Sequence, residues 1–113
     1  MSDCLFCKIV DGKIPAKLVA EDERAVAFRD LNPQAPTHVL IIPRKHIASL
    51  DVLEDADSAI VGHLFVLAKK IAKDEGLTQG WRTVFNVGQH AGQTVFHIHL
   101  HLIGGRALGW PPG

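Results

Sequence analysis

The chain has 113 residues, with 12 basic and 12 acidic side chains and seven histidines. A chain of this length forms one modest hydrophobic core, so we expect a single domain over residues 1–113. The balanced charge favours neither nucleic acid nor a membrane surface, and no apolar run near the start is long enough for a signal peptide or a membrane span. We therefore expect a cytoplasmic protein with a small-molecule ligand and no nucleic-acid or membrane partner.

The N-terminal part of the chain predicts a short helix followed by three strands. In residues 3–12, DCLFCKIVDG, apolar side chains recur at helical spacing, and the closing glycine is a common helix stop. Residues 16–21 and 24–30 are typical of two paired strands, joined at the charged EDE. Residues 37–43, THVLIIP, are rich in β-branched side chains and end at a proline, so we expect a third strand there.

The C-terminal part predicts the main helix and two further strands. Over residues 54–75 the apolar positions follow helical spacing, and Gly76 supplies a natural C-terminal stop. Residues 81–88 and 95–104 are typical of strands, separated by the polar, glycine-containing loop 88–94. Short connections and one helix between the third and fourth strands predict an α+β fold, in which a five-stranded antiparallel sheet carries one main helix and a short N-terminal helix.

Three histidines alternate with apolar residues in VFHIHLHLIGG, residues 95–105. A solvated strand face normally carries Thr, Lys, Glu or Arg, so this clustering of imidazoles is unusual. Because alternate side chains of a strand share a face, we expect His97, His99 and His101 on one face, about 6 to 7 Å apart. Neutral imidazole is a metal ligand and a nucleophile, and its protonated form holds anions and donates protons. The row therefore predicts a phosphate site or a metal site.

The segment CLFC is a Cys-x-x-Cys motif, which alone is a weak signal. It fits a redox pair, half of a zinc site, or two core thiols. The redox version expects a preceding strand, for which the chain has no room this close to its start. Zinc would need two more ligands, and His46 together with the triad histidines is available. We therefore favour structural zinc.

Two further segments have polar side chains that fit a nucleotide, although ordinary turn chemistry also accounts for each. The loop NVGQHAGQT has two glycines, so its backbone amides can approach a phosphate closely, but solvated glycine loops are common. Asp30 can bind ribose hydroxyls, yet Asp before Asn and Pro is equally typical of a turn. The neighbouring histidines favour the phosphate interpretation of the loop.

Together these motifs resemble the histidine triad (HIT) superfamily over nearly the whole chain. The resemblance rests on HIHLHLIGGR, NPQAPTHVLIIPRKHI, AGQTVFH and the closing LGWPPG, and the alternating histidine motif is highly specific. It is closest to the branch of histidine triad nucleotide-binding proteins. This resemblance implies a HIT fold and a homodimer whose two sheets join into one. Each subunit would bind a purine nucleoside monophosphate and cleave the P–N bond of nucleoside phosphoramidates through a nucleotidyl-histidine intermediate.

The resemblance also assigns roles to individual positions. It makes His99 the nucleophile toward the α-phosphorus, and His101 the residue that holds the phosphate and assists the leaving group. His38 matches a fourth histidine that buttresses the nucleophile, and Asp30 matches the ribose ligand. The remaining nucleotide-binding positions are an apolar slot for the base, formed by Phe6, Ile9, Ile14, Phe28 and Leu31, and a phosphate loop, formed by Asn86, Gln93, Thr94 and Val95. Thr94 stands where many relatives have Ser, which keeps the hydroxyl.

The same resemblance implies a metal and a functional C-terminus. Cys4, Cys7, His46 and His97 match zinc ligands found in some relatives, whereas other relatives lack the cysteines. Zinc would be structural, and we expect no catalytic metal, because no acidic cluster typical of a Mg²⁺ site is present. Trp110 and the final Pro-Pro-Gly resemble a tail that reaches toward the partner subunit's site and influences substrate choice.

Other functions remain open at this level. A dinucleoside polyphosphate hydrolase of the same superfamily would use the same nucleophile with a phosphate leaving group, although the short C-terminus favours the phosphoramidase. A hexose-phosphate nucleotidyltransferase is disfavoured, since that branch is longer and carries Gln where this chain has His101. A nucleotide-sensing or protein-interaction module with incidental catalysis has the same sequence features.

Overall fold

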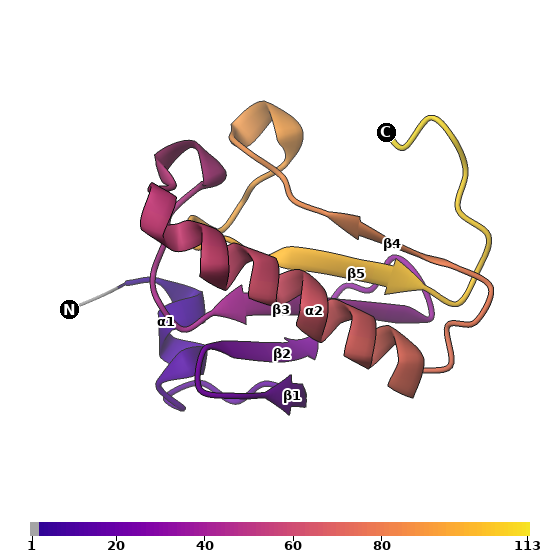
Figure 1. The fold of residues 1–113 in the computed structure, drawn as a ribbon, viewed down its shortest axis with the longest axis horizontal. Helices are drawn as coiled ribbons and strands as arrows, with labels where there is room; N and C mark the ends of the chain where they lie inside the picture. Colours follow the sequence, from indigo (N-terminus) through magenta and orange to yellow (C-terminus); the bar gives the residue numbers. More distant parts are fainter. Residues whose placement is uncertain (1–2) are drawn as a thin grey trace.

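A five-stranded antiparallel sheet organises residues 3–113, which are the residues that the computed structural model describes (Figure 1). Its strands lie in the order β1-β2-β3-β5-β4. They are β1 (Leu18–Glu21), β2 (Ala25–Arg29), β3 (Thr37–Pro43), β4 (Trp81–Val84) and β5 (Leu100–Gly104). The short helix α1 (Leu5–Val10) precedes the sheet, and the main helix α2 (Ser58–Asp74) connects β3 to β4. The expected α+β architecture is confirmed.

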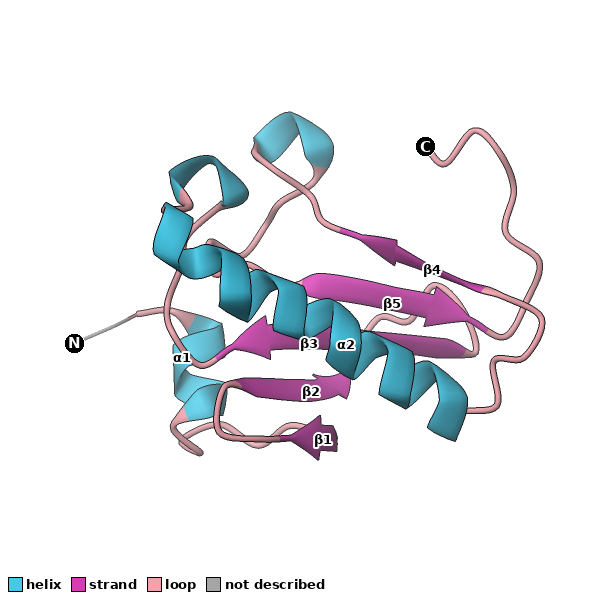
Figure 2. Cartoon of the chain, in the orientation of Figure 1, coloured by secondary structure: helices cyan, strands magenta, loops and turns pink. Residues whose placement is uncertain are grey.

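The sheet is covered on both faces, which explains why all seven residues of β3 are buried. Helix α2 lies across one face, as Figure 2 shows. Alternate side chains of β2 and β3 pack there against the apolar side of α2, namely Ala25, Ala27, Val39 and Ile41 against Leu64, Leu67, Ala68 and Ile71. The opposite alternation packs with α1 in a second cluster that contains Phe6, Val26, Phe28, Leu40 and Ile42. The period-2 pattern of the strands therefore sorts residues between two small cores.

The last two strands are shorter than the sequence predicted. The predicted strands 81–88 and 95–104 were wrong for residues 85–88 and 95–99, because the chain leaves the sheet between Phe85 and His99. In this stretch the backbone N–H of Ile98 donates to the carbonyl of Ile47 at 2.8 Å, where a strand would donate to its neighbour. His97 and His99 consequently lie on the irregular segment that enters β5, and only His101 lies in the strand.

The main helix also begins later than predicted. Two 3₁₀ turns, Leu50–Val52 and Asp55–Asp57, precede α2, and the side chains of Glu54 and Asp57 form a reciprocal capping box. Gly76 follows the helix with φ of 72°, which is the left-handed conformation expected of a helix stop. Among the described residues, no helix is long and apolar enough to cross a membrane.

Candidate active site

A cavity of about 300 Å³ opens beside the histidines, on the face of the sheet that α1 covers. Its lining includes all the residues that the sequence assigned to nucleotide binding except Gln93. These are Phe6, Ile9, Ile14, Phe28, Asp30, Leu31, Asn86, Thr94, Val95, His99 and His101. One wall is apolar and comes mainly from α1 and β2, and the opposite wall is polar and comes from the loop before β5. Such a cavity suits an aromatic ring at one end and a charged group at the other.

His99 presents one ring nitrogen to this cavity in a fixed state. Its Nδ1 atom lies 2.9 Å from the carbonyl oxygen of His97, so Nδ1 carries the proton and donates it. Burial lowers the pKa of His99, with the His97 carbonyl and the Asp30 charge opposing the shift, so the ring is neutral at pH 7. The edge of Phe6 packs against the ring, with centroids 5.0 Å apart. Nε2 therefore carries a lone pair with a fixed direction, as a nucleophile requires.

A chain of hydrogen bonds places the proton of His101 on Nε2, whereas that of His99 is on Nδ1. The backbone N–H of Gln34 donates to Nδ1 of His38 at 3.0 Å, and a backbone amide can only donate. The proton of neutral His38 is therefore on Nε2, which lies 2.9 Å from Nδ1 of His101. Because Nδ1 of His101 accepts this bond, its own proton is on Nε2. His38 therefore bonds to His101, whereas the resemblance had placed it behind the nucleophile.

Nε2 of His101 is a buried donor with no partner among the described residues. Burial lowers the pKa of His101 to about 4, and the neighbouring His99 and His38 rings add to this effect. Burial also lowers the pKa of His38, against the opposing charge of Asp30. An unpaired buried N–H costs free energy unless a ligand accepts from it. His99 and His101 thus place a lone pair and a proton in one cavity, with ring centroids 5.1 Å apart.

Gln93 holds the phosphate-loop segment in shape from behind. Its Oε1 accepts from the backbone N–H of Gly88 at 3.0 Å, and its Nε2 donates to the carbonyls of Ala48 and Val95. Gly88 and Gly92 have φ of 82° and 90°, which the tight loop requires. Gln93 itself is only 3% exposed and does not line the cavity. Its position supports the loop that carries Thr94 and Val95.

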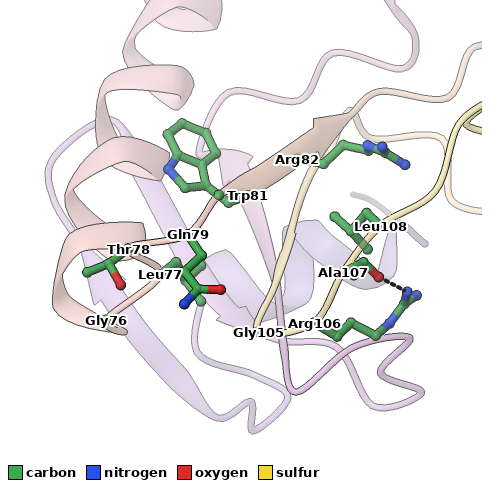
Figure 3. Close-up of a pocket in the computed structure, with 11 residues that line it drawn as sticks. Gly76, Leu77, Thr78, Gln79, Trp81, Arg82, Gly105, Arg106, Ala107 and Leu108 are labelled. Atoms are coloured by element: carbon green, nitrogen blue, oxygen red, sulfur yellow. Dashed lines mark hydrogen bonds between the residues drawn. The ribbon is translucent and has the colours of Figure 1, made fainter.

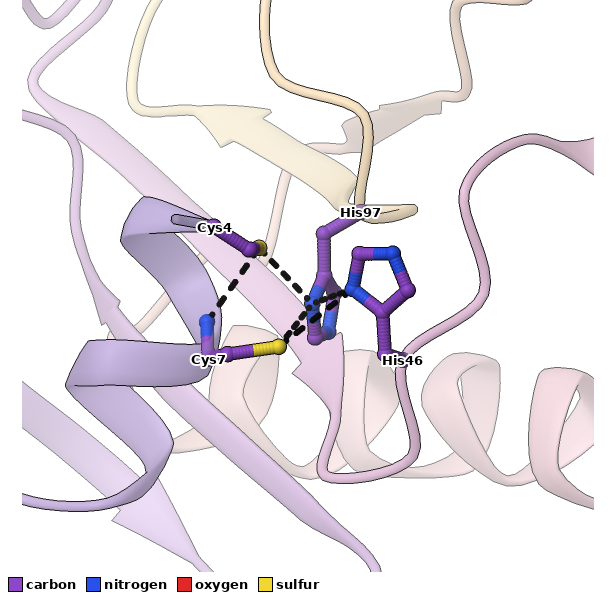
Figure 4. A group of neighbouring side chains, drawn as sticks. All are labelled: Cys4, Cys7, His46 and His97. Atoms are coloured by element: carbon purple, nitrogen blue, oxygen red, sulfur yellow. Dashed lines mark hydrogen bonds between the residues drawn. The ribbon is translucent and has the colours of Figure 1, made fainter. Parts of the chain in front are cut away.

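Cys4, Cys7, His46 and His97 form a group whose four ligand atoms all lie within 4.8 Å of one another (Figure 4). Nδ1 of His97 lies 3.4 Å from Sγ of Cys4, 3.5 Å from Sγ of Cys7 and 3.2 Å from Nδ1 of His46. Tetrahedral zinc, with Zn–S about 2.3 Å and Zn–N about 2.0–2.1 Å, places sulfur and nitrogen about 3.5 Å apart. Nε2 of His97 donates to the carbonyl of Pro43 at 2.8 Å, which leaves Nδ1 as the lone pair. The group fits zinc in donor type, spacing and tautomer.

A second group of possible ligands consists of Asp30 and His101, which line the cavity, and His38, which is buried and does not line it. It suits a metal less well, because Nδ1 of His38 accepts from the Gln34 amide and the proton of this ring is therefore on Nε2, the nitrogen that would have to coordinate. Oδ2 of Asp30 lies 3.4 Å from Nε2 of His38, and Oδ1 of Asp30 accepts from the backbone N–H of Asn32 at 2.8 Å. This group is therefore organised as a hydrogen-bonded network.

A larger cavity, of about 570 Å³, lies where β4 begins and β5 ends (Figure 3). It is formed by residues 76–82 and 105–108, and it contains no histidine, cysteine or acidic side chain. Arg82, on β4, and Arg106, after β5, both line it, as Figure 3 shows. Its lining has none of the groups that form or break bonds, so the histidine cavity is the candidate active site.

Sequence reasoning missed two contributors to this site. The Gln34 amide is a backbone group, so no side-chain motif marks it. Arg106 bonds to the Gln34 carbonyl, and its only sequence signal is its place in the Gly-Gly-Arg that follows the triad.

A row of alternating histidines that leads into β5, an interior strand of an antiparallel α+β sheet, is the feature expected of the class of histidine triad proteins. The chain belongs to the HIT domain family, whose model matches residues 11–108. It is similar to a HIT family hydrolase from Legionella pneumophila, with 56% identity, a TM-score of 0.96, and coverage of 98% of this chain and 100% of that one. It is 52% identical over 111 residues to an uncharacterized HIT-like protein of Synechococcus elongatus, covering 98% of this chain and 97% of the relative.

A more distant similarity links the chain to a histidine triad nucleotide-binding protein from Candida albicans. Its crystal structure has a TM-score of 0.79 and 35% sequence identity, with coverage of 96% of this chain and 83% of that one.

Proposed function

We propose that this protein is a hydrolase that cleaves the P–N bond of purine nucleoside phosphoramidates through a covalent nucleotidyl-histidine. The observation that carries the proposal is the pairing of His99, whose Nε2 has a lone pair, with His101, whose Nε2 has an unpartnered proton, in one cavity. The similar HIT family hydrolase and the nucleotide-binding relative support the reaction class and the ligand class.

The walls of the cavity match the parts of a nucleotide. The aromatic and aliphatic side chains of Phe6, Ile9 and Phe28 offer an apolar slot for the purine. Asp30 faces the same cavity and offers a carboxylate to the ribose hydroxyls. Loop residues Asn86 and Thr94 lie where polar groups can surround the phosphate.

The proposed reaction has two steps. In the first step Nε2 of His99 bonds to the α-phosphorus and the P–N bond breaks. The anionic substrate raises the proton affinity of the His38–His101 pair, so the pair takes up a proton from solvent and passes it from Nε2 of His101 to the leaving amine. In the second step water attacks phosphorus and the P–N bond to His99 breaks. The proton of the water moves to His101, and the His38–His101 pair releases it to solvent, which returns both rings to their starting state. The products are the amine and a nucleoside monophosphate.

We further propose that Zn²⁺ is held by Cys4, Cys7, His46 and His97. These residues come from the N-terminal segment, the loop after β3 and the segment before β5, so the ion would join three parts of the chain. Its contribution would be structural, since His97 points its ring away from the nucleophile and reaches His99 only through its backbone carbonyl.

We also propose that the protein is a homodimer that joins through the β4 edge. Strand β4 pairs only with β5, so its outer edge is open among the described residues. Two large apolar side chains are exposed there: Trp81 of β4 at 41%, and Phe65 of α2, whose ring packs against Phe85 next to β4, at 43%. An open edge flanked by apolar groups favours strand pairing with a second copy.

The test of the proposed activity is a parallel incubation with an adenosine phosphoramidate, a dinucleoside polyphosphate and a nucleotide sugar. We expect the phosphoramidate to have the highest kcat/KM. Faster cleavage of the dinucleoside polyphosphate would assign the protein to the rival hydrolase. Tight nucleotide binding without turnover of any of the three would favour a nucleotide-sensing module.

A further inference from the structure

We propose that Arg106 is a positioning residue for His101, acting through the loop that carries Gln34 and through His38. The proposal rests on the function proposed above, because it assigns His101 the leaving-group proton. Arg106 is separated from the end of β5 by Gly105 and is exposed. It lines the larger cavity and not the histidine cavity, so it has no access to the reacting phosphorus.

Two N–H groups of the Arg106 guanidinium donate to the same carbonyl oxygen. Nε and Nη2 donate to the oxygen of Gln34 at 3.1 and 2.9 Å, and Nη1 donates to the carbonyl of Ala107 at 2.9 Å. A planar guanidinium that donates through two nitrogens restricts both the position and the orientation of its acceptor. Residue 34 is therefore fixed at its carbonyl while its N–H meets Nδ1 of His38.

The loop needs such a clamp because little else holds it. Residues 31–34 are exposed, and Leu31 is 93% exposed. Apart from the bond of the Gln34 N–H to His38, the bonds within the loop are local: Nε2 of Gln34 donates to the carbonyl of Asn32, and the backbone N–H of Asn32 donates to Asp30. Local bonds keep the shape of a turn, whereas the Arg106 bonds tie the turn to the end of β5.

Two glycines bring Arg106 to this position. Gly105 has φ of +93°, and a Cβ on it would lie 2.9 Å from Cβ of Pro36. A Cβ on Gly104 would lie 2.8 Å from Cδ1 of Leu77. Gly105 therefore lets the chain after β5 turn in close contact with the loop, and Gly104 lets the end of β5 pack against Leu77. This accounts for the Gly-Gly-Arg motif, which the nucleotide site leaves unexplained.

The consequence for chemistry follows from the tautomer chain. If residue 34 shifts, Nδ1 of His38 loses its donor, and the ring is free to carry its proton on either nitrogen. The donor to Nδ1 of His101 is then lost in part of the population, and with it the fixed proton at Nε2. Arg106 thus acts on the proton of His101 through Gln34 and His38. The Gln34 carbonyl and N–H belong to the two successive peptide groups of that residue, so holding one restricts the other.

The variants for the test are Arg106→Gln, Arg106→Lys and the matched control Arg82→Gln. Arg82 also lines the larger cavity (Figure 3). Its Nη2 donates to the carbonyl of Gly109, which is unconnected to the loop. The first readout is the ¹⁵N chemical shift of the ring nitrogens of His38 and His101 in the protein without substrate. We expect wild type and Arg82→Gln to have both protons on Nε2, and Arg106→Gln to have averaged shifts.

The second readout is turnover of an alkylamine phosphoramidate. We expect Arg106→Gln to lower kcat about tenfold with KM changed by less than about threefold, and Arg106→Lys, which keeps one donor, to recover part of the loss. Ring-nitrogen shifts like those of wild type in folded Arg106→Gln would overturn the proposal, as would equal losses in Arg82→Gln. If Arg106→Gln does not fold, wild-type shifts and kcat in Arg106→Lys would likewise count against it.

The two readouts separate this proposal from the proposed function. Changed ring-nitrogen shifts in a protein that cleaves no phosphoramidate would support the coupling and refute the hydrolase. Normal phosphoramidate turnover with unchanged shifts in Arg106→Gln would support the hydrolase and refute the coupling.

Discussion

The carbonyl oxygen of His97 accepts the ring N–H of His99 at 2.9 Å, while the ring of His97 faces the two cysteines. One residue thus contributes its side chain to the metal group and its backbone to the nucleophile. The carbonyl of Pro43 accepts from Nε2 of His97 and so fixes the orientation of the His97 ring. The row of three histidines therefore serves three different purposes, each set by a different backbone or ring partner.

We expect His99→Ala to abolish turnover while nucleotide affinity stays within about tenfold of wild type, because the substitution removes the bond-forming nitrogen and few ground-state contacts. The measurement compares single-turnover rates with nucleoside monophosphate binding by calorimetry. His90→Ala is the matched control, since His90 is exposed in the loop and outside the cavity. Turnover near the wild-type rate in His99→Ala would end the assignment of the nucleophile.

We expect the purified protein to carry about one zinc ion per chain and the double variant Cys4→Ser, Cys7→Ser to carry none. A metal that binds only the folded state contributes about 3 kcal/mol to stability at a hundredfold its Kd, so the variant should unfold at lower urea concentration. The kcat of the variant, measured under conditions where it is folded, should stay close to that of wild type, while its free energy of unfolding falls. Metal analysis and urea unfolding provide the two measurements.

Two results would contradict the structural role of zinc. One is native protein that contains no metal. The other is chelation that stops catalysis completely while the protein stays folded by circular dichroism.

Local sequence patterns predicted most of the helices and strands. The strand ends that were predicted wrongly depend on contacts between residues distant in the chain. Residues 37–43 were placed correctly because a β-branched run closed by proline is a local signal. Residues 95–99 have the same alternation, yet the bond from Ile98 to Ile47 draws them out of the sheet, and this bond joins residues distant in the chain. Strand length near a site thus depends on tertiary partners that periodicity does not contain.

The site shows the same division. The types and spacing of the histidines indicated a phosphate or metal site, since clustered imidazoles are rare without a function. Which nitrogen of each ring carries the proton depends on the carbonyls of Pro43 and His97 and on the Gln34 amide. Backbone groups occur at every position, so no residue-type pattern identifies these three.

We expect a symmetric dimer in solution, since a subunit of this size has a small core and β4 leaves an open edge. Light scattering at micromolar concentration should give twice the mass of the chain. Trp81→Glu should weaken the dimer, because it places a charge among the exposed apolar side chains. Leu18→Glu serves as the control, since exposed Leu18 lies in β1 at the opposite edge of the sheet. A monomeric wild type would refute the expectation.

We expect His101 to make the folding stability depend on pH between 6.5 and about 4. The unfolded ring takes up a proton as the pH falls below 6.5, whereas burial keeps the pKa of the folded ring near about 4. The unfolded state thus binds more protons in this window, and stability falls with decreasing pH by at most about 1.4 kcal/mol per unit. Urea unfolding at several pH values should show a smaller slope for His101→Gln than for wild type. Equal slopes would show that the folded ring titrates normally.

The role of His101 as proton donor predicts a dependence on the leaving group. A poor leaving group such as an alkylamine needs a proton as the P–N bond breaks, whereas a phenolate leaves as a stable anion. His101→Ala should therefore slow the alkylamine phosphoramidate at least about tenfold more than an activated phenyl ester of the same nucleotide. His97→Ala should slow both substrates by the same factor, because a ligand of the metal group acts through the fold. Rates for both substrates in both variants decide the matter, and equal losses in His101→Ala would reduce His101 to a phosphate anchor.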